Sequence, residues 1–148
     1  MTDDDLSSRT STQRWGDNLA ALKTLQKIRA EGRTPTVEEQ RILARYSGFG
    51  DSGFEQAFKP DSKDAAWKRR GDDLRKLVSP EEYASIRASR INANYTTSGV
   101  IRAMWSALDR FGVRGPNLRV LDPSSGSGRY FGLLPADLAQ GATRWAVE

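Results

Sequence analysis

The stretch Leu118 to Phe131 combines a short apolar run, an acidic residue and two spaced glycines, a pattern typical of a ligand-binding loop. Its apolar start predicts a short strand, which Asp122 and Pro123 end because proline has no amide hydrogen for a ladder. Gly126 and Gly128 allow the backbone to turn sharply and to approach a ligand without a β-carbon in the way. The stretch therefore predicts a strand, a tight loop and the start of a helix.

A second short strand is predicted at Thr143 to Glu148, and it ends in a carboxylate. Glu148 lies 20 positions after Gly128. A nucleoside-binding βαβ unit places a carboxylate on the ribose hydroxyls at a similar distance of about 20 residues. The two segments together predict such a βαβ unit.

The charges of this loop favour one class of cofactor over another. A dinucleotide would place its pyrophosphate at the helix N-terminus, where Asp122 would repel it by about 1 kcal/mol at roughly 4 Å in water, and by more when partly buried. S-adenosylmethionine carries an ammonium and a sulfonium and no phosphate, so Asp122 would attract it. A nicotinamide-dependent oxidoreductase is therefore disfavoured. The remaining alternative is an ordinary βα loop with a solvated Asp122.

Composition indicates a globular protein that is not embedded in a membrane. The chain has 148 residues, 37% of them apolar, which is enough for a domain with a real core. No apolar run approaches the roughly 18 residues that a spanning helix needs, and the start MTDDDLSS lacks the regions of a secretory signal. The absence of cysteine fits the reducing environment of the cytoplasm, which is the predicted location.

Two missing residue types restrict the chemistry of the chain. Without cysteine and histidine, the chain by itself cannot form a thiolate or histidine-ligated metal site, a disulfide, a cysteine nucleophile or a Ser-His-Asp triad. No metal site is predicted. The net charge of +4 permits a polyanionic partner such as DNA.

The elements that precede the loop are predicted to be mostly helical. Met1 to Thr12 is polar and is expected to be a disordered tail. Two helices are predicted to begin at capping boxes, Thr36 to Glu39 and Ser79 to Glu82. An earlier helix is predicted from apolar residues that recur at steps of three and four and so share one face, and Gly32 is expected to end it. The apolar residues are Trp15, Leu19, Leu22, Leu25 and Ile28.

Gly48 to Gly53 reads GFGDSG and matches the dinucleotide fingerprint G-x-G-x-x-G. That fingerprint needs a strand before it, whereas a helix is predicted to precede this segment. Phe49, Phe54 and Phe58 flank or interrupt the glycines. We therefore predict a flexible loop whose aromatic side chains pack on the core, and no dinucleotide site.

Residues 59–76 form the most polar stretch, in which a tryptophan stands beside a basic cluster. The tryptophan could stack on a base while the cations hold phosphates. A solvated helix face with one packed ring explains the same residues, and it is the favoured interpretation. The candidate DNA-binding residues are Trp67, Lys68, Arg69 and Arg70.

Residues 92–98, NANYTTS, separate two predicted helices and place hydroxyl groups at the entrance of the second. Thr97 or Ser98 could cap that helix, which Gly112 is expected to end. The entrance could also fold back over the pocket of the glycine loop. Six apolar residues make the helix strongly amphipathic: Val100, Ile101, Met104, Trp105, Leu108 and Phe111.

The segments NYTTSGVIRAMW and VLDPSSGSGRYF together resemble the start of the S-adenosylmethionine-dependent DNA adenine methyltransferases of restriction-modification type. In that family a Tyr/Phe-Thr-Pro segment precedes a helix and an Asp-Pro-x-x-Gly-x-Gly-x-Phe loop. The segments EEQRILARYSGFG, VSPEEY and SRINANYT are similar to large phage and mobile-element proteins in which the methyltransferase lies N-terminal to a helicase. The resemblance covers roughly Arg14 to Glu148.

The resemblance implies a role for each residue that matches the family pattern. Tyr95 and Thr96 would line the methionine end of S-adenosylmethionine, and Glu148 would accept the ribose hydroxyls. Phe131 would pack behind the loop under the cofactor. Thr97 stands where the family usually has a proline, so the backbone there lacks the restriction that proline imposes. The loop itself would contain Asp122, Pro123, Ser124, Gly126 and Gly128.

The catalytic loop of that family is absent from this sequence. Methyl transfer to a flipped adenine uses an Asn/Asp-Pro-Pro-Tyr/Phe loop there. The only Asp-Pro pair here is Asp122-Pro123, so no catalytic residue is predicted. We therefore expect the N-terminal part of a longer methyltransferase, inactive alone, whose partners are DNA and the rest of the methyltransferase and helicase polypeptide.

The predicted fold class is α/β. A helical N-terminal region at residues 13–92 is expected to precede the first βαβ unit of a truncated, Rossmann-like methyltransferase core at residues 93–148. Two parallel strands alone would leave apolar faces and edges uncovered. The alternative function is a non-enzymatic DNA-binding module of a larger helicase or restriction-modification protein.

Overall fold

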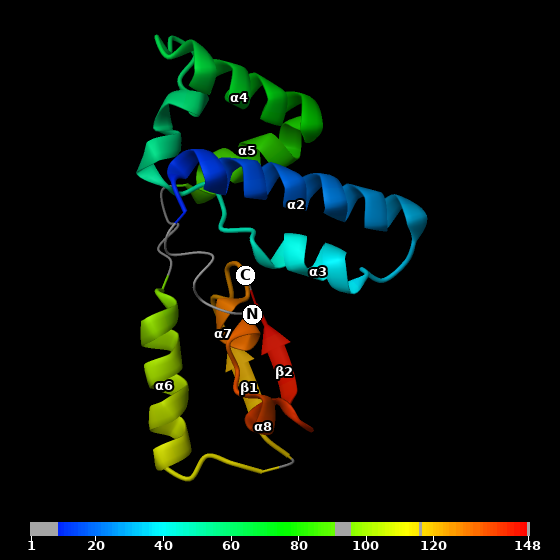
Figure 1. Cartoon of the computed structure of the whole chain (residues 1–148), viewed down its shortest axis with the longest axis vertical. Helices are drawn as coiled ribbons and strands as arrows, with labels where there is room; N and C mark the ends of the chain where they lie inside the picture. The colour runs from blue at the N-terminus through cyan, green and yellow to red at the C-terminus, as the bar shows by residue number, and fades with distance from the viewer. Residues whose placement is uncertain (1–8, 91–95, 116, 148) are drawn as a thin grey trace. The chain divides into compact units, whose positions relative to one another are not determined.

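The computed structural model describes residues 9–90, 96–115 and 117–147. The chain divides into two compact units, residues 2–94 and residues 95–148, which we call the helical unit and the sheet unit. The protein is mostly helical and has a small two-stranded parallel sheet (Figure 1). The coarse α/β prediction agrees with this content.

The helical unit is built from helices of very different length. Residues 1–8, part of the predicted tail, lie outside the described residues. The helices of the described part are α2 (Ser11–Glu31), α3 (Val37–Ala44), the 3-10 helix η1 (Ser52–Phe58), α4 (Ala65–Leu77) and α5 (Pro80–Ser89).

Helix α2 contains the predicted apolar face and ends at Gly32, whose φ of 60° is left-handed. The helix begins at Ser11, so the prediction of a disordered tail through Thr12 is wrong at its end. The reason is a capping box that the sequence analysis missed. The Thr10 hydroxyl accepts from the Gln13 amide at 3.3 Å, and the Gln13 side-chain oxygen accepts from the Thr10 amide at 2.9 Å.

The two predicted capping boxes are confirmed. The Thr36 hydroxyl accepts from the Glu39 amide at 3.2 Å, and the Glu39 carboxylate accepts from the Thr36 amide at 2.9 Å. Ser79 and Glu82 make the same pair of bonds at 3.2 and 2.9 Å, and Pro80 occupies the first helical position. These bonds satisfy amides that a helix start would otherwise leave unpaired.

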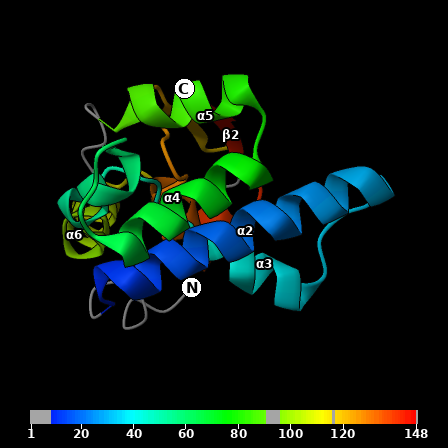
Figure 2. The same cartoon turned by 90° about the horizontal axis from the view of Figure 1, so that it is seen from above.

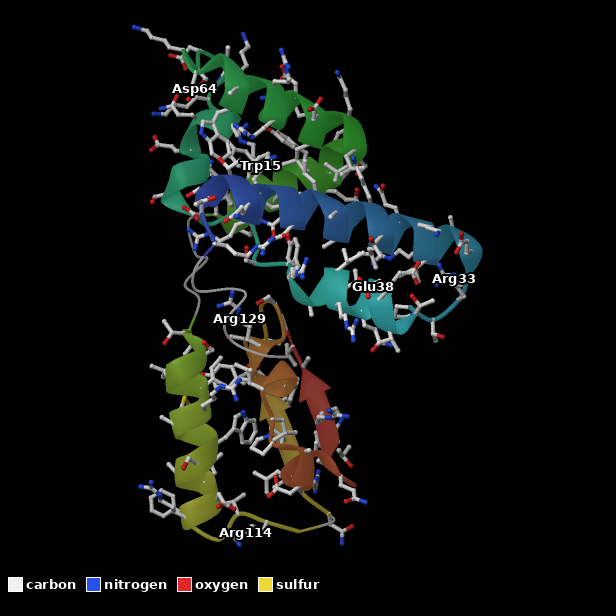
Figure 3. The ribbon with its side chains drawn as sticks, in the orientation of Figure 1. Trp15, Arg33, Glu38, Asp64, Arg114 and Arg129 are labelled. Carbon is white, nitrogen blue, oxygen red and sulfur yellow. The ribbon has the colours of Figure 1, made fainter. Side chains whose placement is uncertain are left out.

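An aromatic cluster around Trp15 forms the core of the helical unit (Figure 3). Trp15 is 1% exposed, and its ring meets four other rings at centroid distances of 5.1 to 5.8 Å, mostly edge to face. This arrangement suits the positive edge and negative face of aromatic rings. The four rings belong to Phe49, Phe54, Phe58 and Trp67.

The GFGDSG segment packs on this cluster, as the sequence predicted. Phe49 and Phe54 are 2% and 0% exposed. A 3-10 helix, η1, covers Ser52–Phe58, so the expected flexible loop is wrong there. Helix α4 approaches η1 closely, because a β-carbon at Gly71 would lie 2.0 Å from the Ala57 carbonyl oxygen.

Asn18, in α2, makes hydrogen bonds to the backbone at the start of the GFGDSG segment. Its side chain is fully buried, its nitrogen donates to the Gly48 carbonyl at 2.6 Å, and its oxygen accepts from the Ser47 amide at 2.8 Å. A buried amide is stable only when such bonds are made. Asn18 thus holds the chain that follows α3.

Helix α3 folds back along α2 (Figure 2). Arg33, in the turn between them, makes two bonds of 2.6 Å to the Glu39 carboxylate. Together with the Thr36 amide, these bonds hold the pKa of Glu39 at about 2. The turn is therefore fixed by a bidentate ion pair at the start of α3.

Glu39→Gln is expected to make the stability of the helical unit less dependent on acid pH. The folded pKa of Glu39, about 2, lies below its ordinary value of 4.5, so the carboxylate stabilises the fold above pH 4.5. That contribution is lost as the pH falls through the interval from 4.5 to about 2. Urea unfolding followed by circular dichroism measures the free energy of unfolding of the variant and of the wild type. The difference between the two should be largest near pH 6 and should shrink across this interval.

Glu38→Gln is the matched control for this prediction. Glu38 pairs with Arg41 at 3.1 Å, but both side chains are at least 70% exposed. Exposed pairs contribute little to stability. A pH dependence of E38Q equal to that of E39Q would contradict the role of the partly buried ion pair between Arg33 and Glu39.

The sheet unit consists of one long helix and a short parallel sheet with two short helices between its strands. Strand β1 (Arg119–Asp122) pairs with β2 (Thr143–Ala146) so that Leu121 lies opposite Trp145 and Asp122 opposite Ala146. The core of the unit is formed by Ile101, Trp105 and Leu138, which are at most 5% exposed. The elements are α6 (Ser98–Arg110), β1 (Arg119–Asp122), α7 (Arg129–Gly132), α8 (Ala136–Ala139) and β2 (Thr143–Ala146).

Helix α6 matches the predicted amphipathic helix but buries only part of its apolar set. Ile101 and Trp105 face the core. The main chain leaves the helix just before Gly112, whose φ is 77°. A two-stranded sheet offers too little surface to cover the rest, so four apolar residues are 37% to 82% exposed: Val100, Met104, Leu108 and Phe111.

The outer face of the sheet is also apolar and exposed. Leu121, Trp145 and Val147 are 61%, 43% and 52% exposed. Parallel sheets normally have both faces covered by helices. The described part of the unit therefore covers one side of β1 and leaves the opposite side to solvent. Among the described residues, every helix is too short or too polar to cross a lipid bilayer.

Candidate functional site

The loop after β1 is shaped by Asp122. One oxygen of its carboxylate accepts from the Ser124 amide at 3.2 Å. This contact closes a tight turn in which Pro123, a residue suited to a turn, occupies an exposed position. The predicted order of strand, tight loop and helix start is confirmed.

Gly126 and Gly128 give the loop its course. Their φ angles are 51° and 72°, in the left-handed region that side chains with a β-carbon disfavour. A β-carbon built on either residue would have no neighbour within 4 Å. The glycines are thus required by backbone conformation, and the space beside them is open to a ligand.

Val147 joins the end of β2 to this loop. Its amide donates to the Asp122 carbonyl at 2.9 Å, and its carbonyl accepts from the Ser125 amide at 2.9 Å. This contact could not be predicted from the sequence, because hydrogen bonds between backbone groups leave no signal in side-chain types. Glu148, the predicted ribose ligand, follows directly in sequence but lies outside the described residues.

The second carboxylate oxygen of Asp122 is buried and has no hydrogen-bond partner among the described residues. An unpaired buried acceptor costs roughly 1 to 3 kcal/mol, and more when it is charged. The alternative of a solvated Asp122 does not match this oxygen, although the other oxygen makes its bond in an exposed position. A buried acceptor without a partner is suited to a donor or cation, which a ligand could supply if the loop shifts to expose this oxygen.

The hydroxyl-rich entrance of α6 lies at the same end of the sheet unit as the loop (Figure 1). Thr96 is half-buried just before the helix, whereas Tyr95 lies outside the described residues. Thr97 occupies the N-cap position, yet its side chain makes no capping bond. The explanation of this segment by capping alone is therefore weakened.

Helix α7 is held against α6 by a side chain that the sequence analysis assigned only to the core. The Trp105 indole donates to the Tyr130 carbonyl at 3.0 Å. Tyr130 also packs against the core of the sheet unit. Phe131, which was predicted to pack behind the loop, is half-buried in α7 and lies outside that set of packed residues.

The predicted DNA-binding residues are divided between the core and the surface of the helical unit. Trp67 packs on the aromatic cluster, and the Arg70 guanidinium lies 4.7 Å from its ring centroid. Its ring is thus engaged within the folded unit, which favours the interpretation of one packed ring on a helix face. The other two candidates are exposed on α4: Lys68 and Arg69.

No acidic cluster that could hold a metal ion occurs among the described residues. Comparisons of the chain with protein-family models, with curated proteins and with solved structures found no match. The function is therefore inferred from the loop and its surroundings.

Proposed function

We propose that the sheet unit binds S-adenosylmethionine at the loop after β1, as the N-terminal part of a Rossmann-like DNA adenine methyltransferase. The main support is the Asp122 carboxylate at the end of a parallel strand, one oxygen of which is buried and has no hydrogen-bond partner within the described segments. The carboxyl ends of parallel strands are the usual place for ligands in open α/β sheets. The resemblance in sequence supplies the identity of the cofactor.

The residues of the loop fit this cofactor by charge and by shape. S-adenosylmethionine would supply the reactive methyl group. Asp122 would attract its positive charges, and the open space at Gly126 and Gly128 would allow close approach of the backbone. By contrast, the negative charge of Asp122 would repel the pyrophosphate of a dinucleotide.

The neighbours of the loop would complete the site. The Val147 bonds fix the end of β2 beside the loop. Glu148, the next residue in the sequence, would bind the ribose hydroxyls, as the family pattern implies. Tyr95 and Thr96, just before α6, would lie along the methionine end. These roles, like that of Ser124, derive from the family pattern.

The full chain is expected to release or absorb heat on titration with S-adenosylmethionine and to give no heat with NADH. The reason is the sign of the charge at Asp122. Because no Asn/Asp-Pro-Pro-Tyr segment occurs in the sequence, labelled cofactor should transfer no methyl group to DNA. Heat with NADH alone would overturn the assignment of the cofactor, and methyl transfer would overturn the predicted need for a further catalytic segment.

The alternative, a non-enzymatic DNA-binding module in the helical unit, is supported by the exposure of Lys68 and Arg69 on α4. Binding through such cations would weaken steeply as the salt concentration rises. Lys68→Ala should therefore lower the affinity for DNA and its dependence on salt. If both are unchanged in this variant, the proposed role of α4 in DNA binding is wrong.

A further inference from the structure

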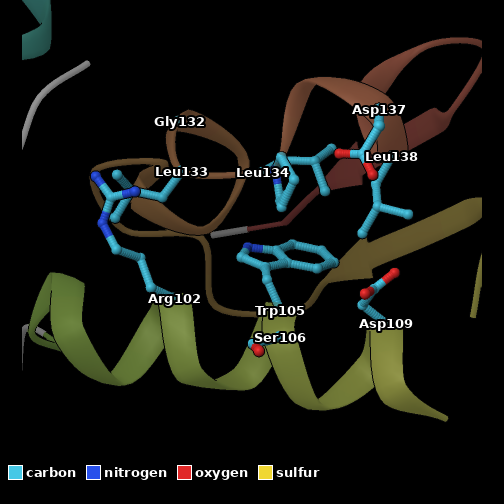
Figure 4. Close-up of a pocket in the computed structure, with 10 residues that line it drawn as sticks. Arg102, Trp105, Ser106, Asp109, Gly132, Leu133, Leu134, Asp137 and Leu138 are labelled. Atoms are coloured by element: carbon cyan, nitrogen blue, oxygen red, sulfur yellow. The ribbon is translucent and has the colours of Figure 1, made fainter.

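A second candidate site lies in the sheet unit, between α6 and the segment of α7 and α8 (Figure 4). It is a pocket of about 420 Å³. Small-molecule sites usually have volumes of roughly 300 to 1,000 Å³. None of its lining residues belongs to the proposed cofactor loop. Its apolar lining consists of Trp105, Leu133, Leu134, Pro135 and Leu138.

Charged side chains stand at the two ends of this pocket. Figure 4 shows the Arg102 guanidinium near Leu133 at one end, and the carboxylates of Asp109 and Asp137 at the other. The lining therefore carries two negative charges and one positive charge. Because they are separated along the pocket, a bound ion would experience a field with a defined direction.

The two carboxylates differ in their partners. Arg114, which does not line the pocket, pairs with Asp109 at 2.6 and 3.0 Å, so the charge of Asp109 is already compensated. Asp137 is exposed and makes no ion pair or side-chain hydrogen bond with the described part of the chain. Asp137 is thus the group that a cation in the pocket would meet.

The floor of the pocket is rigid. The indole of Trp105 is 5% exposed, and its nitrogen donates to the Tyr130 carbonyl at 3.0 Å. An indole held in this way offers an apolar wall with little loss of side-chain entropy on binding. Leu134 and Leu138, from the opposite segment, supply the facing apolar surface (Figure 4).

We propose that this pocket binds a small organic cation, with its apolar body between Trp105 and Leu134 and its ammonium group at Asp137. This site is independent of the proposed cofactor loop, so either proposal can fail without the other.

Phenylpropylamine is a suitable probe, with phenylpropanol and phenylpropanoate as neutral and anionic relatives that share its body. In the full chain, the amine is expected to shift the indole NMR signal of Trp105 saturably and to bind more tightly than the other two. Asp137→Asn should weaken the amine roughly three- to fivefold, the effect of one exposed ion pair. Asp73→Asn, on α4 in the helical unit, is the control and should bind as the wild type does.

Ser106→Phe provides a second, independent test, because Ser106 lines the pocket from an exposed position on α6 and a larger side chain there would fill it. Binding should be lost while the circular dichroism spectrum is kept. Equal affinities for the amine and the alcohol would overturn the role of Asp137. Tighter binding of the anion, or no saturable shift with any probe, would overturn the site.

Discussion

Trp15→Ala is expected to destabilise the helical unit by about 3 to 5 kcal/mol, the range for removal of a large buried aromatic side chain. Trp15 is 1% exposed and is the ring that the other members of the cluster share. The four rings around it come from three places in the chain, the segment before η1, η1 itself and α4, so no single neighbour can collapse into the space. A loss of this size is a large share of the roughly 5 to 15 kcal/mol that stabilises a typical domain.

Chemical denaturation followed by far-ultraviolet circular dichroism measures this effect, because most helical residues of the chain lie in the helical unit. Trp145→Ala is the matched control. Trp145 is 43% exposed on β2 and contacts the Arg119 guanidinium at 5.4 Å, so its removal should change stability by at most about 0.5 kcal/mol. Equal losses in the two variants would contradict the central position of Trp15.

The helices of the helical unit could be predicted because their signals are local. The spacing of apolar residues from Trp15 to Ile28 and the Thr36 and Ser79 capping boxes depend only on residues within a few positions of one another. Asn18 could not be predicted in the same way. Its partners, Ser47 and Gly48, lie about 30 positions away. The presence of a polar residue on an apolar helix face does not indicate which distant backbone groups it will bind.

The amphipathic helix α6 shows a different limit of sequence reasoning. Its apolar residues were expected to share one buried face, and the helix does form at that place. The number of these residues that become buried depends on how many strands the sheet opposite contains. The spacing of apolar residues along the helix does not predict that number. Ile101 and Trp105 are buried, whereas Val100 and Phe111 remain exposed.

The course of the candidate loop was predictable because each residue has a backbone reason to be there. Pro123 ends the ladder, and Gly126 and Gly128 take positive φ angles. The unpaired oxygen of Asp122 and the bonds of Val147 could not be predicted, since both depend on how β2 meets the loop in space. These two features are also the ones that bear most directly on ligand binding.

Asp122→Asn is expected to weaken S-adenosylmethionine binding by roughly 10- to 150-fold, the effect of losing a hydrogen bond or contact to a charged group. Asparagine keeps a side-chain oxygen that can accept from the Ser124 amide, as Asp122 does at 3.2 Å. The turn is therefore kept while the negative charge is removed. Asp122→Ala removes both the turn contact and the charge, and it should abolish measurable binding.

Comparison of the two variants by calorimetry separates the electrostatic role of Asp122 from a purely structural one. If Asp122 only closed the turn with Ser124, the asparagine variant would bind the cofactor as the wild type does and only the alanine variant would fail. If its charge attracts the cofactor, both variants should lose affinity although the thermal unfolding of the asparagine variant is nearly unchanged. Asp73→Asn removes one negative charge from the helical unit and should leave binding intact, because Asp73 is exposed, is not part of the loop, and its charge is screened by salt.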